Sequence, residues 1–184
     1  MVNWCGTSDL LFNTPPVSNH LHTCLITGFY IDESLFPSSC ILPPPHASIP
    51  YSFTAPRQPS PLPPSTQPRT LLLGPFCGRP ACQYIVARQT GGVCSAAYLR
   101  GETVRVDDVH AFEGHIACDA DTKSEVVVPL VYTGADGALR VLGVLDLDCV
   151  AKAGFDDMDV QALERIAELV VRSCEWAKEW ALDE

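Results

Sequence analysis

The sequence predicts a mixed α/β domain, in which a central antiparallel sheet has a C-terminal amphipathic helix on one face and a ligand pocket on the other. Two observations carry this prediction. Two β-prone runs, 126–132 and 139–147, flank the Gly- and Asp-containing segment 133–137, as in a hairpin. Apolar residues then recur at intervals of three and four over 157–180, which is the spacing of an amphipathic helix.

Length and composition limit the architecture and the partners. The 184 residues provide material for one ordinary domain with an irregular extension, and 47% hydrophobic residues allow a buried core. The formal net charge is -10 and no Lys/Arg-rich run is present, which argues against nucleic acid and anionic membranes as partners. No apolar run approaches the roughly 20 residues of a membrane helix, and no secretion signal opens the chain. We therefore expect a soluble, cytoplasmic protein with its nine cysteines in a reducing compartment.

The chain begins with a segment of different character. Eleven prolines lie between residues 37 and 68, interleaved with Ser and Thr, and each removes a backbone hydrogen-bond donor. We expect an irregular Pro-rich segment over 1–68 ahead of a folded domain over 69–184. A linker or long loop is the simpler interpretation, and a polyproline ligand for a partner domain is the alternative.

Short elements precede the hairpin. Apolar runs at 70–73 and 84–87 indicate strands, 93–99 indicates a short helix, and the alternation at 103–106 indicates a further strand. The turn formers Gly74-Pro75 should end the first of these strands.

The second strand of the hairpin predicts two chemically different faces. Alternation places one apolar set where it should meet the helix: Val141, Gly143, Leu145 and Leu147. The opposite set begins apolar and finishes with two carboxylates about 7 Å apart: Leu142, Val144, Asp146 and Asp148.

A third acid, Glu125, opens the preceding strand and completes a candidate pocket with Asp146 and Asp148. Three carboxylates that converge repel, so without a cation at least one should hold its proton near neutrality. Such a site can bind an ammonium group and donate a proton. The alternative is that these are ordinary strand-end acids in solvent.

Three cysteines lie in predicted loops beside turn formers: Cys82, Cys94 and Cys118. Cys118 is the first candidate for chemistry, because a thiol in a polar, partly open loop can ionise and react. A thiol redox cycle also needs a resolving thiol within disulfide reach, about 5 to 6 Å between Cα atoms. Buried or incidental thiols are the alternative, and Cys149 and Cys174 are interpreted as structural.

Metal binding is a further possibility for the loop. His110, His115 and Cys118 have the chemistry of zinc ligands and could be joined by one of the acids. Their spacing fits no CxxC pattern, so we favour histidines that order the loop or help to ionise Cys118. We expect no metal and no cofactor.

Five segments together resemble the free methionine-(R)-sulfoxide reductases, which are single GAF domains. They are LLLGPFCGRPAC (71–82), GGVC (91–94), DVHAFEGHIACDADTKSEVVVPL (108–130), GVLDLDC (143–149) and GFDDMDVQALERIAELV (154–170). The resemblance covers about 69–175, and the HIACD and SEVVVP strings are specific to that family. The fungal members are most similar, through the LDCV and GFD residues.

The resemblance implies thiol-dependent reduction of free L-methionine (R)-S-oxide to L-methionine. Cys118 matches the family's nucleophile, which becomes a sulfenic acid, and Cys94 and Cys82 match its other two redox cysteines. One of these would close an intramolecular disulfide with Cys118, and thioredoxin would reduce it. Which of the two resolves the sulfenic acid stays open. Compared with the family pattern, this chain has two extra residues near Gln89-Thr90, between Cys82 and Cys94. They affect whether Cys94 can come within disulfide distance of Cys118.

The resemblance also implies substrate-binding residues. Glu125, Asp146 and Asp148 match the family's pocket acids, and Trp4 and Tyr30 match aromatic lid positions over the substrate. The alternation along the second strand of the hairpin, which places Asp146 and Asp148 on one face, agrees with this assignment of the acids.

The N-terminal part departs from the family pattern. The aromatic segment is interrupted by residues 7–27, only remnants of the family's first strand follow, and the helix that precedes this segment in the family is absent. We expect a truncated N-terminus with a retained intron, and either a weakened fold or a homodimer that covers the exposed face. A GAF sensor module without turnover and an inactive isoform are the alternative functions.

Overall fold

The computed structural model describes residues 24–36, 69–134 and 136–176. Its strands are β1 (Cys24–Asp32), β2 (Thr70–Gly78), β3 (Tyr84–Val86), β4 (Val104–Val106), β5 (Ser124–Thr133) and β6 (Leu139–Cys149). Its helices are α2 (Gly92–Arg100) and α3 (Asp157–Ser173), with short 3-10 turns η3 (Glu33–Leu35) and η4 (Val109–Ala111). No helix in these ranges is long and apolar enough to cross a membrane.

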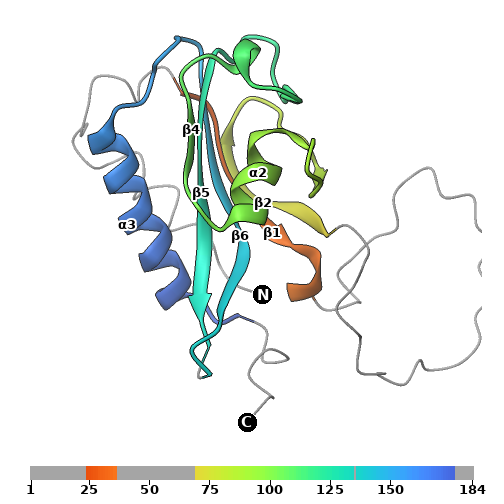
Figure 1. Ribbon diagram of the computed structural model, residues 1–184, viewed down its shortest axis with the longest axis vertical. Coiled ribbons are helices and arrows are strands. Elements are labelled where there is room, and N and C mark those ends of the chain that lie inside the picture. The colour runs from red at the N-terminus through yellow and green to blue at the C-terminus, as the bar shows by residue number, and fades with distance from the viewer. Residues whose placement is uncertain (1–23, 37–68, 135, 177–184) are drawn as a thin grey trace, which may run out of the picture.

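The six strands form one antiparallel sheet in the order β3-β2-β1-β6-β5-β4. Helix α3 lies on one face of the sheet and α2 on the other (Figure 1). Each helix covers its own hydrophobic cluster, with Leu163 of α3 in one and Val93 of α2 in the other. The predicted antiparallel sheet with a C-terminal helix on one face is therefore confirmed.

Strand β1 lies in the middle of the sheet, between β2 and β6. Phe29 and Ile31 point into the cluster under α3, whereas Tyr30 is fully buried in the cluster under α2. The expectation of an irregular segment over 1–68 is thus corrected for residues 24–32, because both faces of this short β-prone run are covered by the rest of the domain. The prolines of 37–68 lie outside the described residues, and the domain boundary at residue 69 stays a prediction.

Strand β2 continues through Gly74-Pro75, where the sequence predicted its end. Gly28 of β1 pairs with Phe76, but Tyr30 pairs with Leu73, so β2 carries one extra residue here. This β-bulge explains the error, because a bulge accommodates a proline that could not donate to a regular ladder.

A second bulge changes the start of β6. Leu130 of β5 pairs with Gly143 and the next residue, Val131, pairs with Val141, so Leu142 is extra. Leu142 consequently packs in the cluster under α3 and Val141 packs against the cluster under α2. The predicted faces are reversed at these two positions.

Beyond the bulge, the predicted alternation of β6 is confirmed. Leu145 and Leu147 pack under α3, and Val144 packs under α2. Asp146 and Asp148 follow on the side of α2, where they line a cavity.

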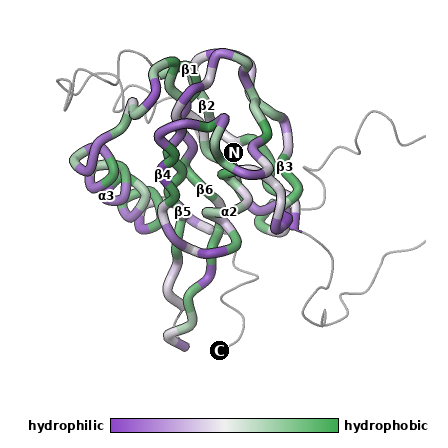
Figure 2. Tube along the Cα trace, turned by 45° about the horizontal axis from the view of Figure 1, so that its top comes forward, coloured by the Kyte–Doolittle hydropathy of each residue, from purple (hydrophilic) through white to green (hydrophobic). Residues whose placement is uncertain are grey.

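Helix α3 begins at a capping box. The Asp156 side chain accepts hydrogen bonds from the backbone N–H groups of Met158 and Asp159, and the Asp159 side chain accepts one from the backbone N–H of Asp156. Hydrophilic and hydrophobic residues alternate around its turns (Figure 2), and the buried ones include Leu163 and Ala167.

Helix α3 ends at Ser173, seven residues before the predicted end at 180. Cys174 is extended, and Trp176 packs against the hydrophobic cluster under α3. The Trp176 indole N–H also donates to the carbonyl of Val171, which fixes this return of the chain. Tertiary packing of an aromatic residue therefore ends the helix earlier than its periodicity predicts.

A first prediction tests the tight junction of β1 and β6. A Cβ atom at Gly143 would meet the carbonyl oxygen of Tyr30 and lie 2.9 Å from the Cα atom of Ile31. Because both obstacles are backbone, Gly143→Ala should destabilise the domain by about 2 to 3 kcal/mol, measured by urea unfolding. Leu139→Ala is the control, since Leu139 is 72% exposed on the same strand. Equal stability of the two variants would contradict this close approach.

Candidate active site

A cavity of about 290 Å³ opens on the α2 side of the sheet. Strand β6 supplies Asp146 and Asp148 to its wall, β5 supplies Glu125, and α2 supplies Cys94. Cys82 and Cys118 reach the same wall from two loops. The three cysteines and three acids that the sequence singled out as candidate site residues therefore surround one cavity.

The three acids are buried together rather than exposed at strand ends. Only 5% of Glu125, 2% of Asp146 and 3% of Asp148 is exposed. The antiparallel register sets Glu125 directly opposite Asp148 on the neighbouring strands. The alternative of ordinary acids in solvent is therefore wrong for all three.

Burial is the main cause that raises the pKa of each acid. It raises the pKa of Glu125 to about 8, with a further contribution from the charge of Asp148. It raises the pKa of Asp148 to about 6. The pKa of Asp146 rises well above its usual range, because burial is reinforced by the charges of Asp148 and Glu125. At neutral pH, protonated and ionised carboxyl groups therefore stand side by side.

The loop cysteines Cys82 and Cys118 are joined by a disulfide, with their Cα atoms 5.4 Å apart. Arg79 holds the two loops together, because its guanidinium lies 3.3 Å from Asp119 and 2.6 Å from Asp121. Arg79 lies three positions before Cys82, and Asp119 and Asp121 lie one and three positions after Cys118. The loops are thus positioned for a bond between these two sulfur atoms.

Tyr30 reaches this sulfur pair from the central strand β1. Its hydroxyl lies 3.9 Å from Sγ of Cys118, and the side chain is fully buried. Tyr30, expected at a lid position over the substrate, is therefore part of the packed interior beside the disulfide. Trp4, the other expected lid residue, lies outside the described residues.

Cys94 is a free, buried thiol in the first turn of α2. Its Sγ donates to Oε1 of Glu125 over 3.8 Å. Burial, followed by the charges of Asp146 and Glu125, raises the pKa of Cys94 well above its usual value. A helix N-terminus favours a thiolate by only about 0.3 to 1 kcal/mol, so the buried acids prevail and Cys94 stays protonated.

His115 contacts an acid rather than a cysteine. Its Nε2 lies 3.4 Å from Oε2 of Glu125, and burial lowers the pKa of the imidazole. His110 is exposed on η4, and Cys118 is bonded to Cys82. The alternative zinc set of His110, His115 and Cys118 is therefore not assembled. Of the two roles expected for His115, helping to ionise Cys118 is corrected and ordering the loop stays a prediction.

Sequence reasoning missed part of the cavity wall. Tyr84 of the edge strand β3 and Ile116 in the loop before Cys118 both line the cavity, and each is 58% exposed. Gly92 lies against Ile116 with a φ of +82°, a backbone conformation that favours glycine. The Gly91-Gly92 pair was a signal for this close approach, but no pattern along the chain indicated Tyr84 or Ile116.

A six-stranded antiparallel sheet with a C-terminal helix on one face and a cavity on the other matches the architecture of a GAF domain. Residues 66–173 match the GAF domain family, and the chain belongs to that family. Within it, the chain is similar to the free methionine-R-sulfoxide reductases, which confirms the resemblance found in its motifs.

Three relatives show how far the similarity extends. The chain is 48% identical over 111 residues to the free methionine-R-sulfoxide reductase of Saccharomyces cerevisiae, covering 60% of this chain and 58% of the relative. It is 41% identical over 115 residues to that of Escherichia coli, covering 61% and 66%. The reduced form of fRMsr of Staphylococcus aureus matches with a TM-score of 0.55 and 33% identity, covering 82% of this chain and 71% of that chain. The chain thus spans about three fifths of the length of its curated relatives.

Proposed function

We propose that this chain is an oxidoreductase that reduces free L-methionine (R)-S-oxide to L-methionine with thiol reductants. The observation that carries the proposal is the single cavity in which Cys82 and Cys118 lie beside three buried acids. The names of the similar reductases support the same reaction. The S. aureus protein has also been solved in complex with its substrate, and that structure matches this chain with a TM-score of 0.54.

The acids suit a zwitterionic sulfoxide in two ways. The pKa of Asp148, about 6, is lower than that of Glu125, so at neutral pH Asp148 can hold the substrate's ammonium group as a carboxylate. Glu125, with its pKa near 8, retains a proton that it can donate to the sulfoxide oxygen. The two roles require opposite protonation states, which the cavity provides in neighbouring side chains.

The proposed reaction begins when the Cys118 thiolate attacks the sulfur atom of the sulfoxide. This attack forms an S–S bond, and the sulfoxide oxygen takes up a proton. Transfer of that oxygen to the Cys118 sulfur then breaks both the S–O bond and the new S–S bond, so methionine leaves and Cys118 becomes a sulfenic acid. The Cys82 thiol then attacks the Cys118 sulfur, water leaves, and the disulfide forms. One sulfoxide and two thiols thus become methionine, a disulfide and water. A dithiol protein of the thioredoxin class would regenerate both thiols by exchange.

Distances favour Cys82 over Cys94 as the resolving thiol. Cys82 is already within bonding reach of Cys118, whereas Cys94 is buried and faces Glu125. Cys82→Ser should therefore release one methionine per protein molecule and then stop with thioredoxin, leaving a sulfenic acid on Cys118. Cys94→Ser should keep thioredoxin-dependent turnover within about 10-fold of the parent, since it forms no bond in the cycle. Chromatographic counting of methionine in single and multiple turnover checks both results, and the reverse pattern would make Cys94 the resolving thiol.

The reaction itself is tested with purified protein, both sulfoxide epimers, and dithiothreitol or thioredoxin as reductant. We expect the R epimer to be consumed and the S epimer to remain. Calorimetric binding of the sulfoxide without any product would instead indicate the alternative, a GAF sensor module. A cytoplasmic location, thioredoxin as the physiological reductant, and a homodimer stay predictions.

A further inference from the structure

We propose that Cys94, Glu125 and Asp146 form a binding site for one thiophilic divalent cation such as Zn²⁺. This site shares the cavity with the proposed reaction but uses neither Cys82 nor Cys118. It differs from the zinc set suggested by the sequence, because it contains none of His110, His115 and Cys118.

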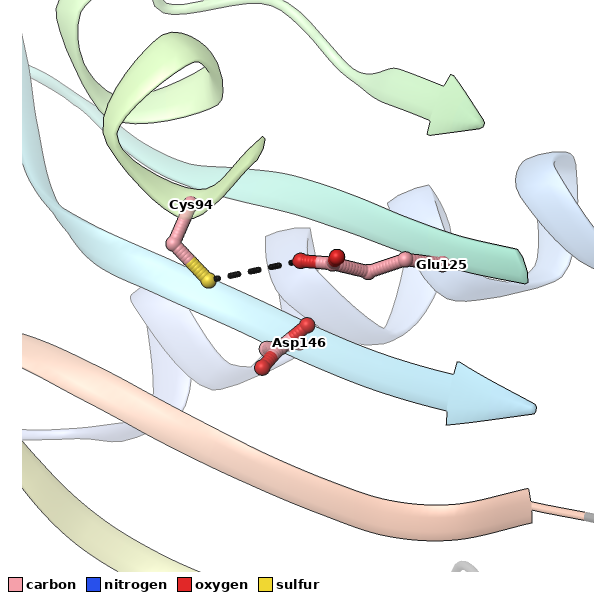
Figure 3. Close-up of side chains that lie close together, drawn as sticks. All are labelled: Cys94, Glu125 and Asp146. Atoms are coloured by element: carbon pink, nitrogen blue, oxygen red, sulfur yellow. Dashed lines mark hydrogen bonds between the residues drawn. The ribbon is translucent and has the colours of Figure 1, made fainter. Parts of the chain in front are cut away.

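The three side chains come from different elements and meet at one point. Figure 3 shows Cys94 of α2, Glu125 of β5 and Asp146 of β6 directed toward one another. One potential ligand atom from each lies within 4.8 Å of the other two. Because helix and strands pack around them, these positions are set by the fold and not by an adjustable surface loop.

The separations suit a small cation. Zinc binds sulfur at about 2.3 Å and carboxylate oxygen at about 2.0 to 2.2 Å, which places sulfur and oxygen about 3.6 Å apart in a tetrahedral site. The observed distance from Sγ of Cys94 to Oε1 of Glu125 is 3.8 Å. Small side-chain rotations would therefore complete three ligands, and the cavity leaves the fourth position to water.

A second observation points independently to a ligand. Oδ1 of Asp146 is buried without a hydrogen-bond partner, in a side chain that is only 2% exposed. A buried polar atom without a partner costs about 1 to 3 kcal/mol, so native structures rarely keep one without a reason. A cation bound between Asp146 and Cys94 would satisfy this atom.

The donor set also selects the kind of cation. One sulfur and two carboxylate oxygens suit Zn²⁺ or Cd²⁺, whereas Mg²⁺ and Ca²⁺ prefer oxygen ligands alone. On binding, the Cys94 thiol would release its proton to solvent, and the cation would neutralise the mutual repulsion of the acids. If the proposed function holds, the bound ion would also occupy Glu125, the proposed proton donor, and so inhibit the reaction reversibly.

Binding can be measured without any turnover, so failure of the proposed function would not affect the test. Protein with the Cys82–Cys118 disulfide intact is titrated with Zn²⁺ against a chromophoric chelator, and with Co²⁺ to detect a thiolate-to-cobalt charge-transfer band. We expect one tight site. Cys94→Ser and Asp146→Asn should each weaken it by more than about 100-fold, since even outer-shell substitutions cost about 10 to 100-fold.

Matched controls are available on the surface. Cys77→Ser removes an exposed thiol of β2, and Asp121→Asn removes an exposed acid, so both should leave Zn²⁺ affinity unchanged. Circular dichroism melts establish that each variant is folded, and Asp146→Asn decides the matter if Cys94→Ser does not fold. Unchanged Zn²⁺ affinity in a folded Cys94 or Asp146 variant, or a Co²⁺ complex without the charge-transfer band, would overturn the proposal.

Discussion

Cys118→Ser should abolish reduction of free methionine (R)-sulfoxide, lowering turnover by at least about 1000-fold. A serine hydroxyl stays protonated at neutral pH and cannot form the sulfenic acid through which the oxygen would leave the substrate. The loss should therefore persist in single turnover and with dithiothreitol in place of thioredoxin. Methionine released per protein molecule, counted by chromatography, is the measurement.

Cys82→Ser is the matched control for this result, because it loses the same crosslink. The disulfide joins residues 36 positions apart, so its removal costs the oxidised protein roughly 4 kcal/mol of stability by the chain-entropy relation. Both variants share that cost, yet only the Cys118 variant should fail in the first turnover. Equal single-turnover yields from the two variants would remove Cys118 from the proposed mechanism.

The free energy of unfolding should fall by several kcal/mol between pH 5 and pH 8. In the unfolded chain, Glu and Asp have pKa values of about 4.3 and 3.9, whereas the folded domain raises the pKa of Glu125 to about 8 and that of Asp148 to about 6. The folded state then binds more protons than the unfolded state. The stability is fully present below the unfolded pKa values and is lost as pH rises through the folded ones.

The slope of the unfolding free energy against pH identifies which groups titrate. Each carboxyl that is protonated only in the folded state contributes about 1.4 kcal/mol per pH unit. His115 opposes this trend only below about pH 6.5, the unperturbed pKa of histidine, because its own pKa is lowered by burial. The interval from pH 6.5 to 8 therefore isolates Glu125 and Asp146, whose folded pKa values are the most strongly raised of the three acids.

Urea unfolding of disulfide-intact protein at several pH values tests this expectation. Glu125→Gln should flatten the dependence above pH 6.5 and raise the stability at pH 8, since it removes a buried acid that must ionise. Glu113→Gln is the control, because Glu113 is an exposed glutamate of the loop that also carries Cys118. A parent protein whose stability does not change over this interval would show that the acids are not buried together.

The gain in stability expected from Glu125→Gln at pH 8 has a functional meaning. Three acids in one cavity destabilise the fold, and apolar residues would pack there at lower cost. We interpret the lost stability as a consequence of the proposed function, in which this site holds an ammonium group and also donates a proton.

Local signals were sufficient for the elements whose partners are close in sequence. The β5–β6 hairpin, the start of α3 and the short helix α2 follow from turn formers, capping residues and periodicity. The strand β1 was not predicted as a full strand, because its neighbour β6 lies more than 100 residues further along the chain. The bulges in β2 and β6 were missed for a different reason, since the register of a strand is decided by its pairing with the partner strand.

The sequence by itself determined the class of fold and the family resemblance. It also predicted the residues of the proposed chemistry: a nucleophilic cysteine, two possible resolving cysteines and three acids. Only the tertiary structure decided that Cys82 is bonded to Cys118, that Cys94 and His115 turn to Glu125, and that Tyr30 is buried beside the sulfur pair. The physical reason is that spacing along a chain limits the distance between two loops without setting it. The packing of helix, strands and loops around the cavity sets that distance, and with it the protonation state of each acid.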